Sequence, residues 1–151
     1  MSIFFKKTEF LSESEKEKII SAIKESERRT SGEIRVYIES RCRFVDPLDR
    51  AKEIFWSLKM DQTTERNAVL IYVTAKDKQM AILGDEGIHQ KVGEVFWTAE
   101  ISKMRMHFKQ QNYMDALVFV IEDIGHALDE HFPYDSKTDK NELPDDIVFG
   151  K

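Results

Sequence analysis

The sequence predicts an α/β fold, a three-layer α/β/α sandwich with a small mixed central β-sheet. Two observations carry this prediction. Residues 68–73 form an unbroken apolar run that does not alternate with polar residues, which is typical of a strand covered on both faces. Segments with apolar residues at helical spacing flank this run in the chain, so helices are available to cover both faces.

The first helix is expected over residues 12–29, and a strand follows it. Ser12, with Glu15 three residues later, is a capping-box pattern at the start of a helix. From Glu33 onwards the apolar period changes to two, which predicts a strand with one well-buried face. The apolar residues of this strand are Ile34, Val36 and Ile38.

A second helix is expected over residues 46–60, which open with a capping aspartate and a first-turn proline. This helix separates the first strand from residues 68–73, so these two strands are expected to be parallel and joined by a right-handed crossover. Residues 75–78 are too few for anything but a hairpin. The next apolar run, residues 80–83, should therefore pair antiparallel with the central strand, which makes the sheet mixed.

Two further helices are expected in the second half of the chain. Apolar residues recur at helical spacing over residues 88–106 and again over residues 114–128. The folded domain is therefore predicted to span residues 1–133. Residues 134–151 are rich in charged and polar side chains and are predicted to form an acidic, mobile C-terminal tail, whose short apolar end at residues 147–149 is able to dock on the domain.

Size and composition narrow the class of protein. The 151 residues are the usual size of one domain, and the formal net charge of −5 argues against a general nucleic-acid surface, which needs a basic footprint. A single cysteine, Cys42, cannot form an internal disulfide and fits the reducing cytosol. The few apolar residues before the first lysines fall far short of a signal peptide or a membrane span, so a cytoplasmic protein with no nucleic-acid and no membrane partner is expected.

The predicted topology brings polar residues from three segments to one edge of the sheet. The start of the first strand, the start of the second and the end of the third meet there. Carboxylate, amide and backbone carbonyl oxygens are the ligands that Ca²⁺ and Mg²⁺ require. We therefore predict a divalent-metal site at this edge, with calcium favoured and magnesium as the alternative. The candidate metal ligands are Glu33, Asn67, Asp85 and Glu86.

Each of these residues also has a purely structural interpretation. Asp85 is well placed as the N-cap of the third helix, Asn67 as a turn residue and Glu33 as the solvated end of a strand. The sequence leaves these interpretations open beside the metal-ligand roles.

Three blocks of sequence carry a family resemblance. Residues 30–34 read Thr-Ser-Gly-Glu-Ile and lead into a strand, and residues 64–71 read Thr-x-x-Asn-x-Val-Leu-Ile. Residues 82–93 read Ile-Leu-Gly-Asp-x-Gly-Ile-His-x-x-Val-Gly, and Phe-Trp follows at 96–97. These blocks, of which the last is the most specific, resemble the cytosolic branch of the TPM domain family over nearly the whole folded part of the chain.

The resemblance implies several properties. It implies an α/β/α sandwich with a mixed sheet and a polar cluster at Glu33, Asn67 and Gly84-Asp85. It also implies the metal binding or the acid-phosphatase activity reported for some relatives. Many secreted relatives have a glutamate where His89 stands here. They also carry a signal peptide and a membrane anchor, neither of which is expected for this chain.

Two functions are compatible with such a cluster. In a weak, metal-assisted acid phosphatase, an ion at Asp85 and Glu33 would polarise a phosphoryl oxygen and lower the pKa of a bound water, with His89 as the candidate catalytic acid or base. In a binding or regulatory module, the ion would stabilise loops and present a surface to an unknown protein partner or a small phosphorylated ligand. The binding module is favoured because the enzyme lacks an identifiable nucleophile.

Overall fold

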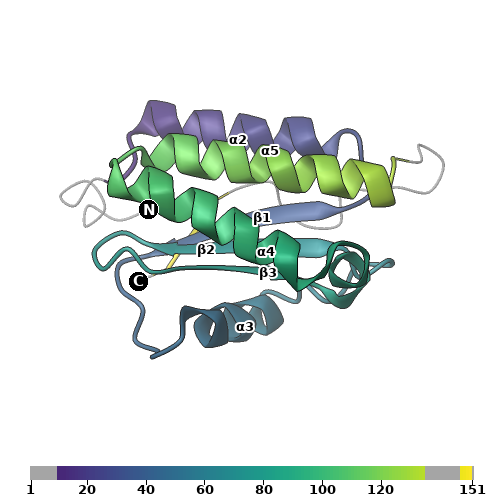
Figure 1. Cartoon of the computed structure of the whole chain (residues 1–151), viewed down its shortest axis with the longest axis horizontal. Coiled ribbons are helices and arrows are strands. Elements are labelled where there is room, and N and C mark those ends of the chain that lie inside the picture. The colour runs from purple at the N-terminus through teal and green to yellow at the C-terminus, as the bar shows by residue number, and fades with distance from the viewer. Residues whose placement is uncertain (1–9, 135–146, 151) are drawn as a thin grey trace.

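A computed structural model of the chain describes residues 10–134 and 147–150. These residues contain four helices and four strands, in the order α2-β1-α3-β2-β3-α4-α5-β4 (Figure 1). The helices are α2 (Glu13–Glu27), α3 (Pro47–Ser57), α4 (Glu86–Lys109) and α5 (Tyr113–His131). The strands are β1 (Glu33–Glu39), β2 (Ala68–Thr74), β3 (Met80–Gly84) and β4 (Ile147–Phe149).

The strands form one mixed sheet in the order β3-β2-β1-β4. β1 runs parallel to β2 and to β4, whereas β2 and β3 are antiparallel. The predicted parallel pair and the predicted hairpin are therefore both confirmed.

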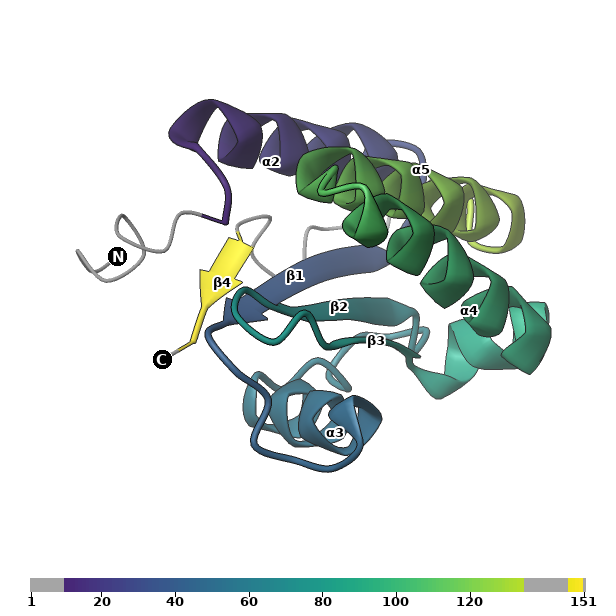
Figure 2. The ribbon, with the colours of Figure 1, turned by 60° about the vertical axis from the view of Figure 1, so that its left-hand side comes forward.

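Helices cover both faces of this sheet. α2, α4 and α5 lie on one side and α3 lies on the other (Figures 1 and 2). Every residue of β2 is buried, as the unbroken apolar run predicts. The α/β/α sandwich is thus confirmed.

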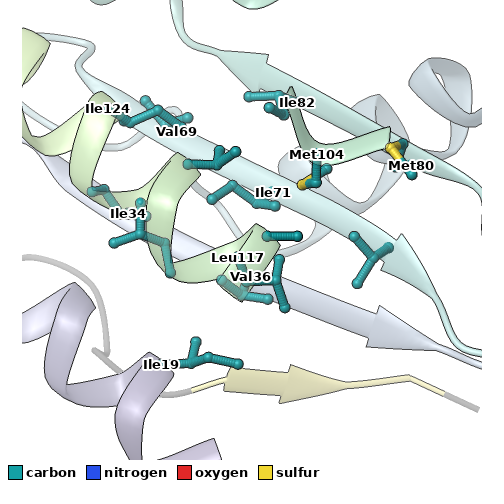
Figure 3. Packing of buried hydrophobic residues seen from close by; sticks show 14 of the residues in the cluster. Ile19, Ile34, Val36, Val69, Ile71, Met80, Ile82, Met104, Leu117 and Ile124 are labelled. Carbon is teal, nitrogen blue, oxygen red and sulfur yellow. The ribbon is translucent and has the colours of Figure 1, made fainter. Parts of the chain in front are cut away.

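The larger apolar core lies between the sheet and the three helices of the first layer. Ile34 and Val36 of β1, and Val69 and Ile71 of β2, point into this core, where Leu117 of α5 meets them (Figure 3). A smaller core lies under α3, where Leu70 and Tyr72 pack against Ala51, Ile54 and Phe55. Alternation along β2 therefore sends successive side chains into two different cores.

Local signals account for where several helices begin. Ser12 and Glu15 form the predicted capping box of α2, each side chain bonding the backbone N–H of the other at 3.1 and 2.9 Å. The Asp46 side chain accepts the Leu48 N–H and caps α3. α4, which the sequence predicts as one continuous helix, is broken at Gly93, where φ is 77° and ψ is 173°.

β1 differs from its prediction. The sequence predicts one buried face, but Glu33, Arg35 and Glu39 on the other face are only 3%, 8% and 5% exposed. β1 is an interior strand between β2 and β4, and its first N–H, on Glu33, donates to the Asn67 carbonyl at 3.4 Å. The interpretation of Glu33 as a solvated strand end is therefore wrong.

The apolar end of the chain docks on the sheet. Residues 147–149, which the sequence predicts as a short apolar end able to dock on the domain, form β4 and pair with Val36, Tyr37 and Ile38. The Gly150 N–H continues this pairing with a 2.7 Å bond to the Ile38 carbonyl. The apolar end of the chain belongs to the sheet because its backbone completes the outer edge of β1. Residues 135–146 of the predicted tail lie outside the described residues.

Among the described residues, none of the helices has the length and apolar character needed to cross a bilayer.

Candidate functional site

The three polar segments meet at one edge of the sheet, as the topology predicts. Glu33 pairs with Ala68 in the parallel register, and the Asp85 N–H donates to the Ala68 carbonyl at 2.9 Å. Glu33, at the start of β1, and Asp85, directly after the end of β3, therefore flank Ala68 in one row at the edge of the sheet. The Ala68 side chain itself belongs to the smaller core under α3.

Three of the four predicted metal ligands are almost completely buried. The exposed fractions of Glu33, Asn67 and Asp85 are 3%, 1% and 6%, whereas the Glu86 side chain is 61% exposed. Carboxylates and amides are rarely buried unless ion pairs or hydrogen bonds offset the loss of hydration. The contacts of these residues therefore decide what the edge can bind.

Asp85 is the N-cap of α4 and also part of an ion pair. Its Oδ1 accepts the Glu86 N–H at 2.8 Å, so the structural interpretation as a cap is confirmed. Arg66 donates from Nε to Oδ2 at 2.6 Å and from Nη2 to Oδ1 at 2.8 Å. This bidentate contact raises the pKa of Arg66.

Arg66 also bridges to the fourth candidate ligand. Its Nη1 lies 3.1 Å from Glu86 Oε1, so one guanidinium binds both acidic residues at the start of α4. This role of Arg66 was not predicted from the sequence. Its position in the turn before β2, at the edge where the carboxylates gather, is the signal that could have indicated it.

Asn67 is held in a chain of side-chain hydrogen bonds. Its Nδ2 donates to Ser31 Oγ at 3.1 Å, and the Ser31 hydroxyl donates to Glu65 Oε2 at 2.7 Å. The Asn67 Oδ1 is buried and has no hydrogen-bond partner in the described part of the chain. A buried carbonyl oxygen without a partner costs about 1–3 kcal/mol, so this acceptor is available to a ligand.

The side chains at this edge of the sheet do not form a preformed metal-binding cluster. Within residues 10–134 and 147–150, no three or more His, Cys, Asp or Glu side chains are grouped so that they could hold a metal ion. What the edge offers is two nearly buried carboxylates and one amide oxygen. Carboxylate and amide oxygens are the ligand types that hard cations take.

His89, the candidate acid or base, lies on the first turn of α4 and is exposed. The indole Nε1–H of Trp97 donates to its Nδ1 at 3.0 Å, across the break at Gly93. In the neutral imidazole the proton is therefore on Nε2. His89 can donate a proton from Nε2, but its Nδ1 is already occupied as an acceptor.

The turn before β2 packs closely against the start of α4. The Gly87 N–H donates to the Arg66 carbonyl at 2.8 Å. A Cβ at Gly87 would lie 2.1 Å from the Glu65 carbonyl oxygen and 2.6 Å from that of Arg66. The glycine therefore permits the close approach that brings the guanidinium of Arg66 to Asp85.

A second polar cluster, not predicted, lies at the opposite end of β1. Arg50 of α3 binds both oxygens of Glu39 at 2.9 Å, and the Tyr72 hydroxyl donates to the same carboxylate. Burial and the bond to Glu39 raise the pKa of Tyr72, which stays protonated. With every carboxylate oxygen of Glu39 engaged, this cluster joins α3 to the sheet.

Comparisons with known proteins agree with the fold. A family model described as the TPM domain matches residues 4–127. The NMR structure of the BA42 protein from the psychrophilic bacterium Bizionia argentinensis is 43% identical, covers 94% of this chain and 97% of that chain, and superposes with a TM-score of 0.85.

A second solved structure shows the fold alone. The N-terminal domain of the cg2496 protein from Corynebacterium glutamicum is 16% identical over 78% of this chain and 74% of that chain, with a TM-score of 0.62. No curated protein matches the chain.

Proposed function

The chain belongs to the TPM domain family, and we propose that it is a binding or regulatory module that takes up a divalent cation at the sheet edge, with calcium preferred to magnesium. Glu33, Asn67 and Asp85 are the proposed ligands, and the exposed Glu86 contributes charge at the rim.

The observation that carries this proposal is the row formed by Glu33, Ala68 and Asp85. Adjacent strands lie about 4.8 Å apart, so the Cα atoms of the two acidic residues, on either side of Ala68, are roughly 10 Å apart. Both carboxylates are nearly buried. A cation between the two carboxylates would receive an oxygen from each side.

Two further features support calcium. The buried Oδ1 of Asn67, which lacks a hydrogen-bond partner among the described residues, is a ligand type that calcium accepts. Calcium tolerates six to eight oxygen ligands in irregular geometry, whereas magnesium demands a near-octahedral shell. A site assembled from a turn and the ends of strands suits the less demanding ion.

Binding is favoured over phosphomonoester hydrolysis because of His89. Its Nδ1 already accepts the Trp97 indole proton, so it does not serve as a base through that atom while the bond persists. The cytoplasmic location and a protein or small phosphorylated partner remain predictions.

Titration calorimetry of the whole chain with CaCl₂ and MgCl₂ tests the cation site. Glu33→Gln and Asp85→Asn should each weaken calcium binding by roughly tenfold or more, since each removes a ligand charge beside the ion. Asp85→Asn keeps a capping side chain, which separates the ligand role from the cap. Glu13→Gln is the matched control, because Glu13 is exposed on α2 at 79% and should leave the affinity unchanged.

Thermal unfolding gives an independent reading. An ion that binds only the folded state stabilises it by about 2.7 kcal/mol at a concentration of 100 Kd.

Calcium affinity that is equal in wild type, Glu33→Gln and Asp85→Asn, or absent from all three, contradicts the proposal. Turnover of p-nitrophenyl phosphate that is lost with chelator and in Asp85→Asn would favour the phosphatase instead.

A further inference from the structure

We propose that Arg66 is a tethered competitor of the cation, so that the Arg66–Asp85 ion pair and divalent-ion binding exclude each other. This inference rests on the proposed function and concerns the control of the same site. Arg66 is not one of the proposed ligands, but it would set the affinity of the site for the divalent ion.

The contacts of Asp85 show why the two cations compete. Its Oδ1 already accepts two hydrogen bonds, from the Glu86 backbone and from Arg66 Nη2, and its Oδ2 accepts one from Arg66 Nε. A carboxylate oxygen has two lone pairs, so little of this carboxylate remains for a metal ion. A divalent ion bound to Oδ2 would also lie next to the positive guanidinium, and like charges at such a distance repel.

The backbone of Arg66 is fixed while its side chain is able to leave. The residue adopts a left-handed conformation with φ of 52°, and its carbonyl accepts the Gly87 N–H at 2.8 Å. The side chain is 35% exposed, so part of it already contacts water. Exchange of guanidinium for metal therefore requires a change of side-chain rotamer and leaves the turn in place.

The exchange has two consequences. Without the ion, the single positive charge of Arg66 is shared between Asp85 and Glu86. With the ion, a guanidinium is released to the surface beside the site. Occupancy of the site then changes the charge that this edge presents to a partner, although the backbone hardly moves.

Calorimetry with CaCl₂ on Arg66→Gln tests the competition. Glutamine keeps a flexible polar side chain at this left-handed position but carries no charge. We expect Arg66→Gln to bind calcium roughly tenfold or more tighter than wild type, and Arg66→Lys, which keeps a charge without the bidentate contact, to fall between them. Arg28→Gln removes the same charge from an exposed side chain at the C-cap of α2, 74% exposed, and should not alter the affinity.

NMR of the wild-type chain supplies a reading that needs no variant. The Arg66 Nε–H resonance should shift as calcium saturates the site, because its bond to Asp85 is lost. If wild type binds calcium but Arg66→Gln binds it no tighter, or if the Nε–H resonance does not move on saturation, the competition is wrong and the cation site stands. If neither wild type nor Arg66→Gln binds calcium, both the competition and the proposed function are wrong.

Discussion

The indole of Trp97 fills the space in front of Gly84, so that a Cβ at this glycine would lie only 2.3 Å from Trp97 Cζ2. The same indole donates to His89 on the far side of the break at Gly93. Trp97 thereby ties the end of β3 to both parts of α4. Because Asp85 follows Gly84 directly, this contact helps to position the carboxylate at the sheet edge.

Gly84→Ala should destabilise the protein by about 1–3 kcal/mol, because the added methyl group overpacks the Trp97 ring. Urea unfolding followed by circular dichroism measures the effect. In a Trp97→Phe background the same substitution should cost less, since the smaller ring leaves room. An equal cost in both backgrounds would show that Trp97 is not the group that Gly84 accommodates.

Glu100 makes stability depend on pH near neutrality. It is 2% exposed, and Lys103 bridges it to Asp123 of α5 at 3.1 and 2.9 Å. Burial, together with Asp123, raises the pKa of Glu100 from its usual 4.5 to about 7. The folded state therefore holds the proton more tightly than the unfolded state, and this contribution to stability is complete below pH 4.5 and is lost as the pH rises to about 7.

Glu100→Gln should remove that dependence. Relative to the variant, the wild type should lose about 1–3 kcal/mol of unfolding free energy between pH 4.5 and pH 7. Chemical denaturation across this range provides the measurement. Glu122→Gln, an exposed carboxylate on α5, is the control and should follow the wild type. A wild-type profile parallel to that of Glu100→Gln would contradict the raised pKa.

Arg50→Met should destabilise the fold by about 3–5 kcal/mol, because it leaves the buried Glu39 carboxylate without its cation. Arg28→Met breaks an exposed pair with Glu25 and should cost less than about 1 kcal/mol. Adding Glu39→Gln to Arg50→Met should restore part of the loss. A double variant as unstable as the sum of the two single variants would mean that the two residues do not interact.

Local patterns were sufficient for most of the fold. The unbroken run in β2, the capping box of α2 and the short hairpin between β2 and β3 each depend on residues close together in the chain. The break in α4 was not foreseen, because a single glycine within a helical pattern is compatible with a continuous helix. Nothing in the local pattern required the positive φ of Gly93.

At the candidate site, the chain order and strand directions already placed Glu33, Asn67 and Asp85 at one edge of the sheet. Their contacts could not be predicted in the same way. The ion pair of Arg66 with Asp85 joins residues 19 positions apart and depends on the register between β2 and β3 and on the close approach at Gly87. The burial of Glu33 and the pairing of β4 with β1 likewise arise between segments distant in sequence. Periodicity and capping patterns predict which face or end of a helix or strand a residue occupies. The residue that it contacts depends instead on how distant segments pack together in three dimensions.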